Sequence, residues 1–291
     1  MKTASNPIPD GPSFSRRTAL GAIVGVGAAA LLAACGSDSK TASTSSATGN
    51  TAGSTSASTT ASSTASTTGS TTGSVTGSAA AGSLTAIPEE TGGPFPGDGS
   101  NGPNVLTQQG VVRKDITSSF GSSTTVAEGV PLTMQFTVTD ASTGSPMNGA
   151  AVYVWHCNRD GEYSMYGQGV QGENYLRGVQ VADANGAVEF DTIFPAAYSG
   201  RWPHVHIEIY ANVDDATSAG SPLRTTQMAM PKEICDQVYS TADGYQQSVT
   251  NLQRTSLSTD MVFGDDDGVH ELATISGSLP SGLVATLPLP I

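Results

Sequence analysis

The sequence predicts an all-β fold for residues 84–291, an antiparallel β-sandwich with long loops and few short helical segments. Short runs in which apolar and polar residues alternate recur along this region, and a period of two is typical of strands with one buried face. These runs are rich in β-branched and aromatic residues, which favour strands. Turn-forming sequences separate them roughly every eight to twelve residues, a spacing that indicates a sandwich or a barrel.

The expected strands follow one another along the chain. In 132–139, four apolar residues alternate with Thr and Gln. Residues 183–186 read Asp-Ala-Asn-Gly, a hairpin turn in which Asn-Gly supplies the positive φ angles that such turns need. The other predicted strands are 150–157, 178–182, 187–193, 204–210, 223–230, 273–277 and 283–287. We expect the last strand to stop at Pro288, because proline cannot donate a backbone hydrogen bond.

Helices are expected to be few and short. Residues 231–239 and 243–252 could form short helical or loop segments. No glycine-rich loop of the kinds that bind dinucleotides or phosphate is present, so the sequence gives no support to nucleotide chemistry.

The first 35 residues have the features of an export signal. Arg16 and Arg17 precede a weakly apolar run at 19–34, and the sequence Leu-Ala-Ala-Cys ends at Cys35. This arrangement is typical of a twin-arginine signal joined to a lipoprotein cleavage site. A membrane-spanning helix is the alternative, but about 16 apolar residues are fewer than the roughly 20 that a span requires. We therefore expect an exported protein, lipid-anchored through Cys35 at the outer face of the cytoplasmic membrane, or extracellular.

Residues 36–83 consist almost entirely of Ser, Thr, Ala and Gly. Such a composition cannot bury enough apolar surface to offset the entropy lost on ordering. We therefore expect this segment to be a disordered tether, which leaves 84–291 as one domain with its own core.

Charge and cysteine content narrow the class of protein. The formal net charge of −13 argues against a nucleic-acid partner and against electrostatic docking on anionic lipid.

Beyond Cys35 the chain has two cysteines, Cys157 and Cys235. In an exported protein two cysteines favour one disulfide, and two buried free thiols are the alternative.

Two histidines on the strand predicted at 204–210 suggest a metal site. His204 and His206 are two residues apart, so their imidazoles point to the same side of the strand and could bind one ion. Two surface histidines on an exposed sheet face are the alternative. Glu208 lies on the same side, but three ligands at this spacing span about 13 Å and cannot readily meet at one ion.

Longer stretches around these histidines resemble the intradiol ring-cleavage dioxygenases, the family of the catechol and protocatechuate dioxygenases. The matching stretches are PEETGGPFP (88–96), VVRKDI (111–116), VYVWHCNRDGEYS (152–164) and NYLRGVQVADANGAVEFDTIFPAAYSGRWPHVHIEIY (174–210). The resemblance implies a non-haem Fe(III) ion as cofactor. Carried over by position, its ligands would be Tyr163, Tyr198, His204 and His206, with Tyr166 as a competing candidate for Tyr163.

The resemblance also implies a reaction. A small aromatic diol of the catechol type and O2 would be the substrates, and cleavage between the two hydroxyl-bearing carbons would give a cis,cis-muconate-type product. Tyr198 would be the ligand that the diol displaces, and Arg201 would stabilise negative charge on the activated substrate. Arg113 and Asp115 match a stretch near the family's pocket and could touch the substrate. A non-catalytic exported β-sandwich that binds aromatic or iron-catecholate ligands is the alternative.

Overall fold

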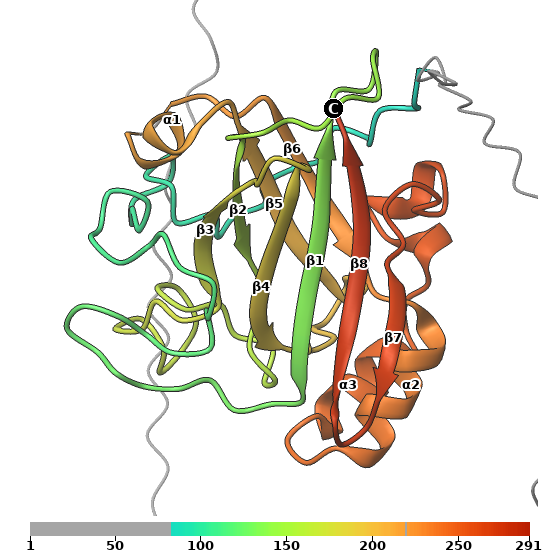
Figure 1. Cartoon of the computed structure of the whole chain (residues 1–291). Coiled ribbons are helices and arrows are strands. Elements are labelled where there is room, and N and C mark those ends of the chain that lie inside the picture. The colour runs from blue at the N-terminus through green and yellow to red at the C-terminus, as the bar shows by residue number, and fades with distance from the viewer. Residues whose placement is uncertain (1–82, 219) are drawn as a thin grey trace, which may run out of the picture. The chain divides into compact units, whose positions relative to one another are not determined.

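The computed structural model describes residues 83–218 and 220–291, and within them eight strands form two four-stranded sheets (Figure 1). One sheet has the order β4-β1-β8-β7 and the other the order β3-β2-β5-β6. The first comprises β1 (Pro131–Thr139), β4 (Ala187–Ile193), β7 (Thr274–Ser278) and β8 (Gly282–Pro290). The second comprises β2 (Ala151–Trp155), β3 (Arg177–Val181), β5 (His204–Tyr210) and β6 (Arg224–Ala229). The predicted all-β fold is thus confirmed.

Helices in the described residues are short. They are α1 (Val213–Thr217), α2 (Lys232–Thr241) and α3 (Gln246–Leu252), followed by the 3-10 turns η1 (Leu257–Thr259) and η2 (Phe263–Asp265). None of the helices in this part of the chain has the length and apolar character that crossing a bilayer requires. The predicted export signal (1–35) and tether (36–83) lie outside the described residues, apart from Ser83, which is exposed.

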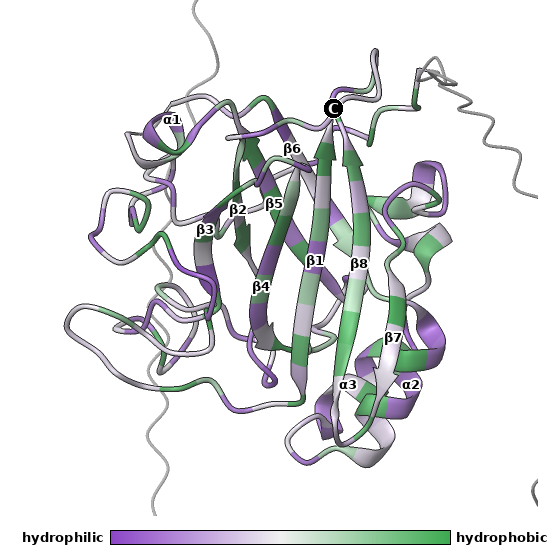
Figure 2. Ribbon diagram, in the orientation of Figure 1, coloured by the Kyte–Doolittle hydropathy of each residue, from purple (hydrophilic) through white to green (hydrophobic). Residues whose placement is uncertain are grey.

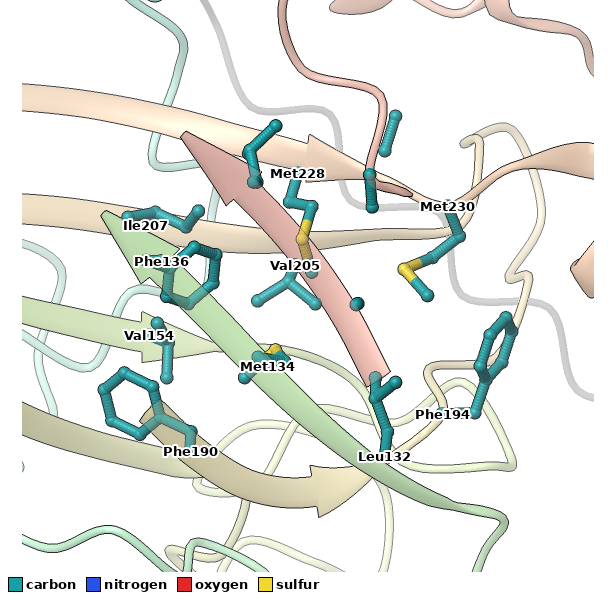
Figure 3. Close-up of a cluster of buried hydrophobic side chains, with 14 of the residues drawn as sticks. Leu132, Met134, Phe136, Val154, Phe190, Phe194, Val205, Ile207, Met228 and Met230 are labelled. Atoms are coloured by element: carbon teal, nitrogen blue, oxygen red, sulfur yellow. The ribbon is translucent and has the colours of Figure 1, made fainter. Parts of the chain in front are cut away.

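The main core lies between the two sheets. Alternate residues of β1 are buried, and the alternation of apolar and polar residues along this strand is visible in Figure 2. Phe136 and Val154, which come from opposite sheets, are part of the same buried cluster (Figure 3). The core residues labelled there are Leu132, Met134, Phe136, Val154, Phe190, Phe194, Val205, Ile207, Met228 and Met230. Period-two alternation in the sequence therefore identified the inward face of each sheet.

The strand pairing differs from the expectation in one respect. All pairs are antiparallel except β1 with β8, which run parallel, so the β4-β1-β8-β7 sheet is mixed.

The last strand, β8, continues past Pro288, where we expected it to stop. β7 pairs with β8 only as far as Thr286, and on the opposite edge the N–H of Ile291 donates to Thr139. Because N–H groups alternate between the two edges, the missing donors of Pro288 and Pro290 fall where no strand pairs with β8.

The expected disulfide is wrong, and the alternative of two buried free thiols is correct. Cys157 and Cys235 are both buried and unpaired. Cys157 packs in an apolar cluster on the outer face of the β3-β2-β5-β6 sheet, whereas Cys235, on α2, packs in the core between the sheets. Each behaves as a small apolar side chain with a weak S–H donor, to Ala196 and Met230 respectively.

The outer face of the β3-β2-β5-β6 sheet is also covered. Every residue of β5 is buried, although its sequence alternates between apolar and polar side chains. Tyr153 and Trp155 of β2 pack there with Val105, Leu106 and Val111 from the segment that precedes β1. The polar side chains of β5 therefore lie in a second buried layer and not at the surface.

A buried carboxyl group lies beside β6. Glu271 has no exposed surface, and among the described residues its Oε2 has no hydrogen-bond partner. The Thr226 hydroxyl donates to its Oε1 at 3.4 Å. Burial raises the pKa of Glu271 from its ordinary value of 4.5 to about 8, and the nearby carboxylates, Glu90 first, act in the same direction.

We expect the Glu271→Gln variant to gain stability relative to the wild type as the pH rises. Because the folded-state pKa of Glu271 is raised, its contribution to stability is complete below pH 4.5 and is lost as the pH rises towards about 8. The free energy of unfolding in urea, measured for both proteins between about pH 5 and pH 8, tests this. Glu233→Gln, at an exposed position on α2, is the control. A difference between Glu271→Gln and wild type that does not change with pH would contradict the expectation.

Candidate metal centre

Four of the residues singled out in the sequence come together at the outer face of β5. The Tyr163 Oη lies 3.3 Å from His204 Nε2 and 3.2 Å from His206 Nε2. The Tyr198 Oη lies 3.2 Å from His204 Nε2 and 3.5 Å from Tyr163 Oη, and the two Nε2 atoms are 3.2 Å apart. Atoms that bind one metal ion at roughly 2 Å are separated from one another by roughly 3 Å. The two oxygens and two nitrogens, here called the four-donor cluster, therefore fit a single ion.

The two histidines owe their position to β5. As neighbours on one side of the strand they point into the second buried layer, where Trp155 stacks flat on His206 with ring centroids 4.8 Å apart. The Nδ1–H of His204 donates to the carbonyl of Trp202. Because that carbonyl can only accept, the Nε2 of His204 carries the lone pair and presents it to the cluster.

The two tyrosines come from two loops that precede β5 in the chain, Tyr163 from the loop after β2 and Tyr198 from the loop after β4. Tyr163 follows a tight turn in which the Asn158 Oδ1 accepts from the N–H groups of Asp160 and Glu162 at 3.0 and 2.9 Å. Gly161 in this turn has a φ of 87°, and a Cβ there would lie 3.1 Å from that of Tyr198. A residue without a side chain at 161 thus lets the two tyrosine loops approach each other.

The loop that carries Tyr198 is fastened to α3. The Ala197 N–H donates to Ser248 Oγ at 3.0 Å, and the Asn251 side chain donates to the Ala197 carbonyl at 2.8 Å. Tyr163 is 3% exposed, whereas Tyr198 is only partly buried. Tyr198 is therefore the donor that lies nearer to solvent.

Burial sets the protonation states of the cluster. It lowers the pKa of His204 to about 3, where the charge of Arg201 adds to the effect, and it lowers that of His206 well below its ordinary 6.5. Burial also raises the pKa of Tyr198 to about 12 and that of Tyr163 well above 10. Both imidazoles are thus neutral, as metal binding requires, and the phenols ionise only beside a cation. A hard trivalent ion with phenolate and imidazole ligands matches this donor set.

Arg201 lies beside the cluster and is held by an ion pair. Its Nη1 is 3.5 Å from His204 Nε2, its Nε is 3.0 Å from an oxygen of the buried Asp260, and its Nη2 donates to Gln227 Oε1 at 2.7 Å. Asp260 also accepts from the backbone N–H of Trp202 at 2.6 Å. The guanidinium therefore has a fixed orientation, with one edge towards the cluster.

Gln227 and Asp260 were not identified from the sequence. Gln227 lies directly opposite His206 in the pairing of β5 with β6, so the register of that pair would have revealed it. Asp260 follows η1 in an irregular segment, and no periodic pattern marks it. Only the fold brings either residue to Arg201.

The other candidates have different partners. The Tyr166 hydroxyl bonds to Gly97 and Asn101, so Tyr163 and not Tyr166 belongs to the cluster. Glu208 accepts from the Tyr210 hydroxyl at 2.7 Å. Over the described ranges, no three His, Cys, Asp or Glu side chains gather in a way that could hold a metal ion. A site built from His204, His206 and Glu208 is thereby excluded.

Arg113 and Asp115, which the sequence suggested as substrate contacts, have structural partners. Arg113 donates to the carbonyls of Asn174 and Arg177. Asp115 accepts from the backbone and the hydroxyl of Thr117. Neither side chain has a hydrogen bond to the four-donor cluster, so the expectation that they face the substrate has no support in the geometry.

Comparison with known proteins identifies the family of this chain. The sequence profile of a family described as Dioxygenase matches residues 101–245, a range that holds all four donors, Arg201 and Gln227. Chlorocatechol 1,2-dioxygenase of Rhodococcus opacus is 34% identical over 100 residues, which are 27% of this chain and 38% of that enzyme. Among solved structures, the intradiol ring-cleavage dioxygenase from Tetranychus urticae superimposes with a TM-score of 0.57 at 26% identity, over 72% of this chain and 95% of that one. The chain belongs to the intradiol ring-cleavage dioxygenase family.

Proposed function

We propose that this protein is a non-haem Fe(III) dioxygenase that cleaves catechol-type aromatic diols between their two hydroxyl-bearing carbons, giving cis,cis-muconate-type products. The observation that carries the proposal is the convergence of two phenol oxygens and two neutral imidazole nitrogens on one buried point. Tyr163, Tyr198, His204 and His206 would hold the iron. Fe(III), when bound, would supply the positive charge that ionises the phenols and activates a chelated diol towards O2.

Tyr198 is suited to accept a proton from the diol. Its hydroxyl has contacts only within the cluster, and its ring is the more exposed of the two tyrosines. A phenolate at this position can take up one of the two protons that a diol loses on ionisation. Tyr163, which is buried and held by its neighbours, is suited to remain in place.

Arg201 is suited to stabilise negative charge on the ionised diol. Its Nη1 faces the cluster at 3.5 Å from His204 Nε2, while Asp260 and Gln227 hold the rest of the guanidinium. A cation that is oriented before the reaction stabilises developing charge without the cost of reorganisation.

The Tyr198→Phe variant tests the ligand set and the reaction together. The iron-loaded wild type should show a visible tyrosinate-to-Fe(III) charge-transfer band that shifts on anaerobic addition of catechol, and air should then yield a ring-opened diacid. We expect Tyr198→Phe to weaken the band and to lower turnover at least about a hundredfold. Tyr166→Phe is the matched control and should keep both.

A non-catalytic binding module is the competing outcome of the same experiment. Catechol binding with no oxygen uptake would favour a module for aromatic or iron-catecholate ligands. A protein that stays colourless after reconstitution with Fe(III) would contradict the proposed function.

The Asp260→Asn variant tests the orientation of Arg201. Asparagine keeps an oxygen acceptor for the backbone but loses the charge that holds the guanidinium. We expect kcat for catechol to fall by about tenfold to a hundredfold with a smaller change in KM, since the lost interaction acts on the transition state. Asp236→Asn, which breaks the exposed pair with Lys232 on α2, is the control. An unchanged kcat in Asp260→Asn would show that the ion pair has no role in catalysis.

We also propose that the protein is exported and lipid-anchored through Cys35, on the strength of the Arg16-Arg17 and Leu-Ala-Ala-Cys signals alone. Cell fractionation of the full chain tests this. The wild type should be recovered with membranes, and Cys35→Ser should no longer be membrane-bound. The same distribution for both proteins would contradict the anchor.

A further inference from the structure

Arg177 is a fully buried cation that the proposed reaction does not use. It begins β3 and has no exposed surface. No carboxylate in the described part of the chain forms a salt bridge with it. Its guanidinium donates only to neutral oxygens, those of Phe95, Pro96, Tyr153 and Ser164. A buried guanidinium without a counter-ion is tolerated only when its N–H groups are all satisfied, so these contacts define its role.

The first set of contacts closes the loop that carries Tyr163. Arg177 Nη2 donates to the Ser164 carbonyl at 2.9 Å, and Nε donates to Ser164 Oγ at 3.0 Å. The Ser164 hydroxyl in turn donates to the carbonyl of Tyr175 at 2.7 Å. The residue that directly follows Tyr163 is thus tied to the end of the same loop.

The backbone next to this closure is strained. Met165, after Ser164, has a φ of 71°, and Leu176, before Arg177, has a φ of 56°. Residues other than glycine rarely adopt such angles, and they persist where surrounding contacts over-determine the conformation. The bonds from Arg177 to Ser164 join the two residues that directly flank this pair, and they supply such contacts.

The second set of contacts holds the segment that packs on the Tyr163 ring. Arg177 Nη2 donates to the Phe95 carbonyl and Nη1 to the Pro96 carbonyl, each at 2.9 Å. The Phe95 ring lies 5.2 Å from that of Tyr163, centroid to centroid. Gly97 follows at a φ of 68°, and a Cβ there would lie 2.9 Å from Arg177 Nη1. The segment is therefore pressed directly against the guanidinium.

We propose that Arg177 is a positioning residue for Tyr163, which it holds in the four-donor cluster through Ser164 on one side and Phe95 on the other. The proposal rests on the proposed function, because it assigns Tyr163 to the metal. It predicts an asymmetry between the two tyrosines. The Tyr198 loop is fastened to Ser248 and Asn251 and receives no hydrogen bond from Arg177.

A double-mutant cycle on metal affinity tests this asymmetry. We expect Arg177→Met to weaken Fe(III) binding by about tenfold to a hundredfold, the usual range for residues that orient a metal ligand. In a Tyr163→Phe background the same substitution should have little further effect, whereas in a Tyr198→Phe background its effect should persist. Equal effects in both backgrounds would overturn the proposal and leave Arg177 a purely structural residue.

Arg113→Met is the matched control. Arg113 is partly buried and donates to the backbone carbonyls of Ser118, Asn174 and Arg177, but none of its partners is Ser164, Phe95 or Pro96. Arg113→Met therefore removes bonds to the backbone of Arg177 and leaves the bonds of the Arg177 side chain in place. We expect it to lower thermal stability without changing the pattern of the cycle. Arg177→Lys keeps the charge but has three donors in place of the fork. It should recover only part of the affinity, and full recovery would contradict a need for the guanidinium geometry.

Hydrogen exchange of the metal-free protein separates this proposal from the proposed function. The N–H groups of Tyr166 and Gly167 donate to the Tyr163 carbonyl, so their exchange reports on this loop. In Arg177→Met we expect faster exchange there and no change at Ala197, which donates to Ser248. If the wild type binds no iron, the proposed function fails, and exchange still decides whether Arg177 holds the loop. If iron binds normally to Arg177→Met and exchange is unchanged, the inference fails alone.

Discussion

The site depends on one constraint, the cover over the outer face of the β3-β2-β5-β6 sheet. The outer face of a sandwich is commonly in contact with water, and polar side chains there remain solvated. Here the segment before β1 and the loop after β2 bury that face. Burial keeps the two imidazoles neutral and the two phenols protonated until a cation arrives. The same low-dielectric surroundings strengthen the field of Arg201 at the cluster.

Much of the fold and part of the site could be predicted because they follow from local rules. Alternation located the strands, and the observed bounds of β4 and β5 equal the predicted ranges. The same alternation placed His204 and His206 on one side of β5. Tyr163 and Tyr198 could not be found that way, since no periodicity links residues on separate loops. They were found through the resemblance to a family, and the geometry agrees with it.

The rest could not be predicted because it depends on tertiary pairing. The parallel alignment of β1 with β8 leaves no local trace in either strand. Gln227 reaches Arg201 through the register of two strands, and Asp260 reaches it from an irregular segment. α1 was missed because it is only five residues long, and its start depends on one Asn212 cap. The disulfide was wrongly predicted for the same reason. Two cysteines in the domain suggested a bond between them, but Cys157 and Cys235 lie in different buried clusters.

β5 has a further consequence for how this protein can change. Its two faces serve different layers, one with Val205 and Ile207 in the main core and the other with His204 and His206 at the site. A slip of one residue in its pairing would exchange the two sets, sending the imidazoles into the apolar core and removing the site in one step. The correct register is thus selected twice, by hydrophobic packing and by ligand placement. A substitution at any position of this strand affects either the packing of the core or the site, so the core and the chemistry of this protein must evolve together.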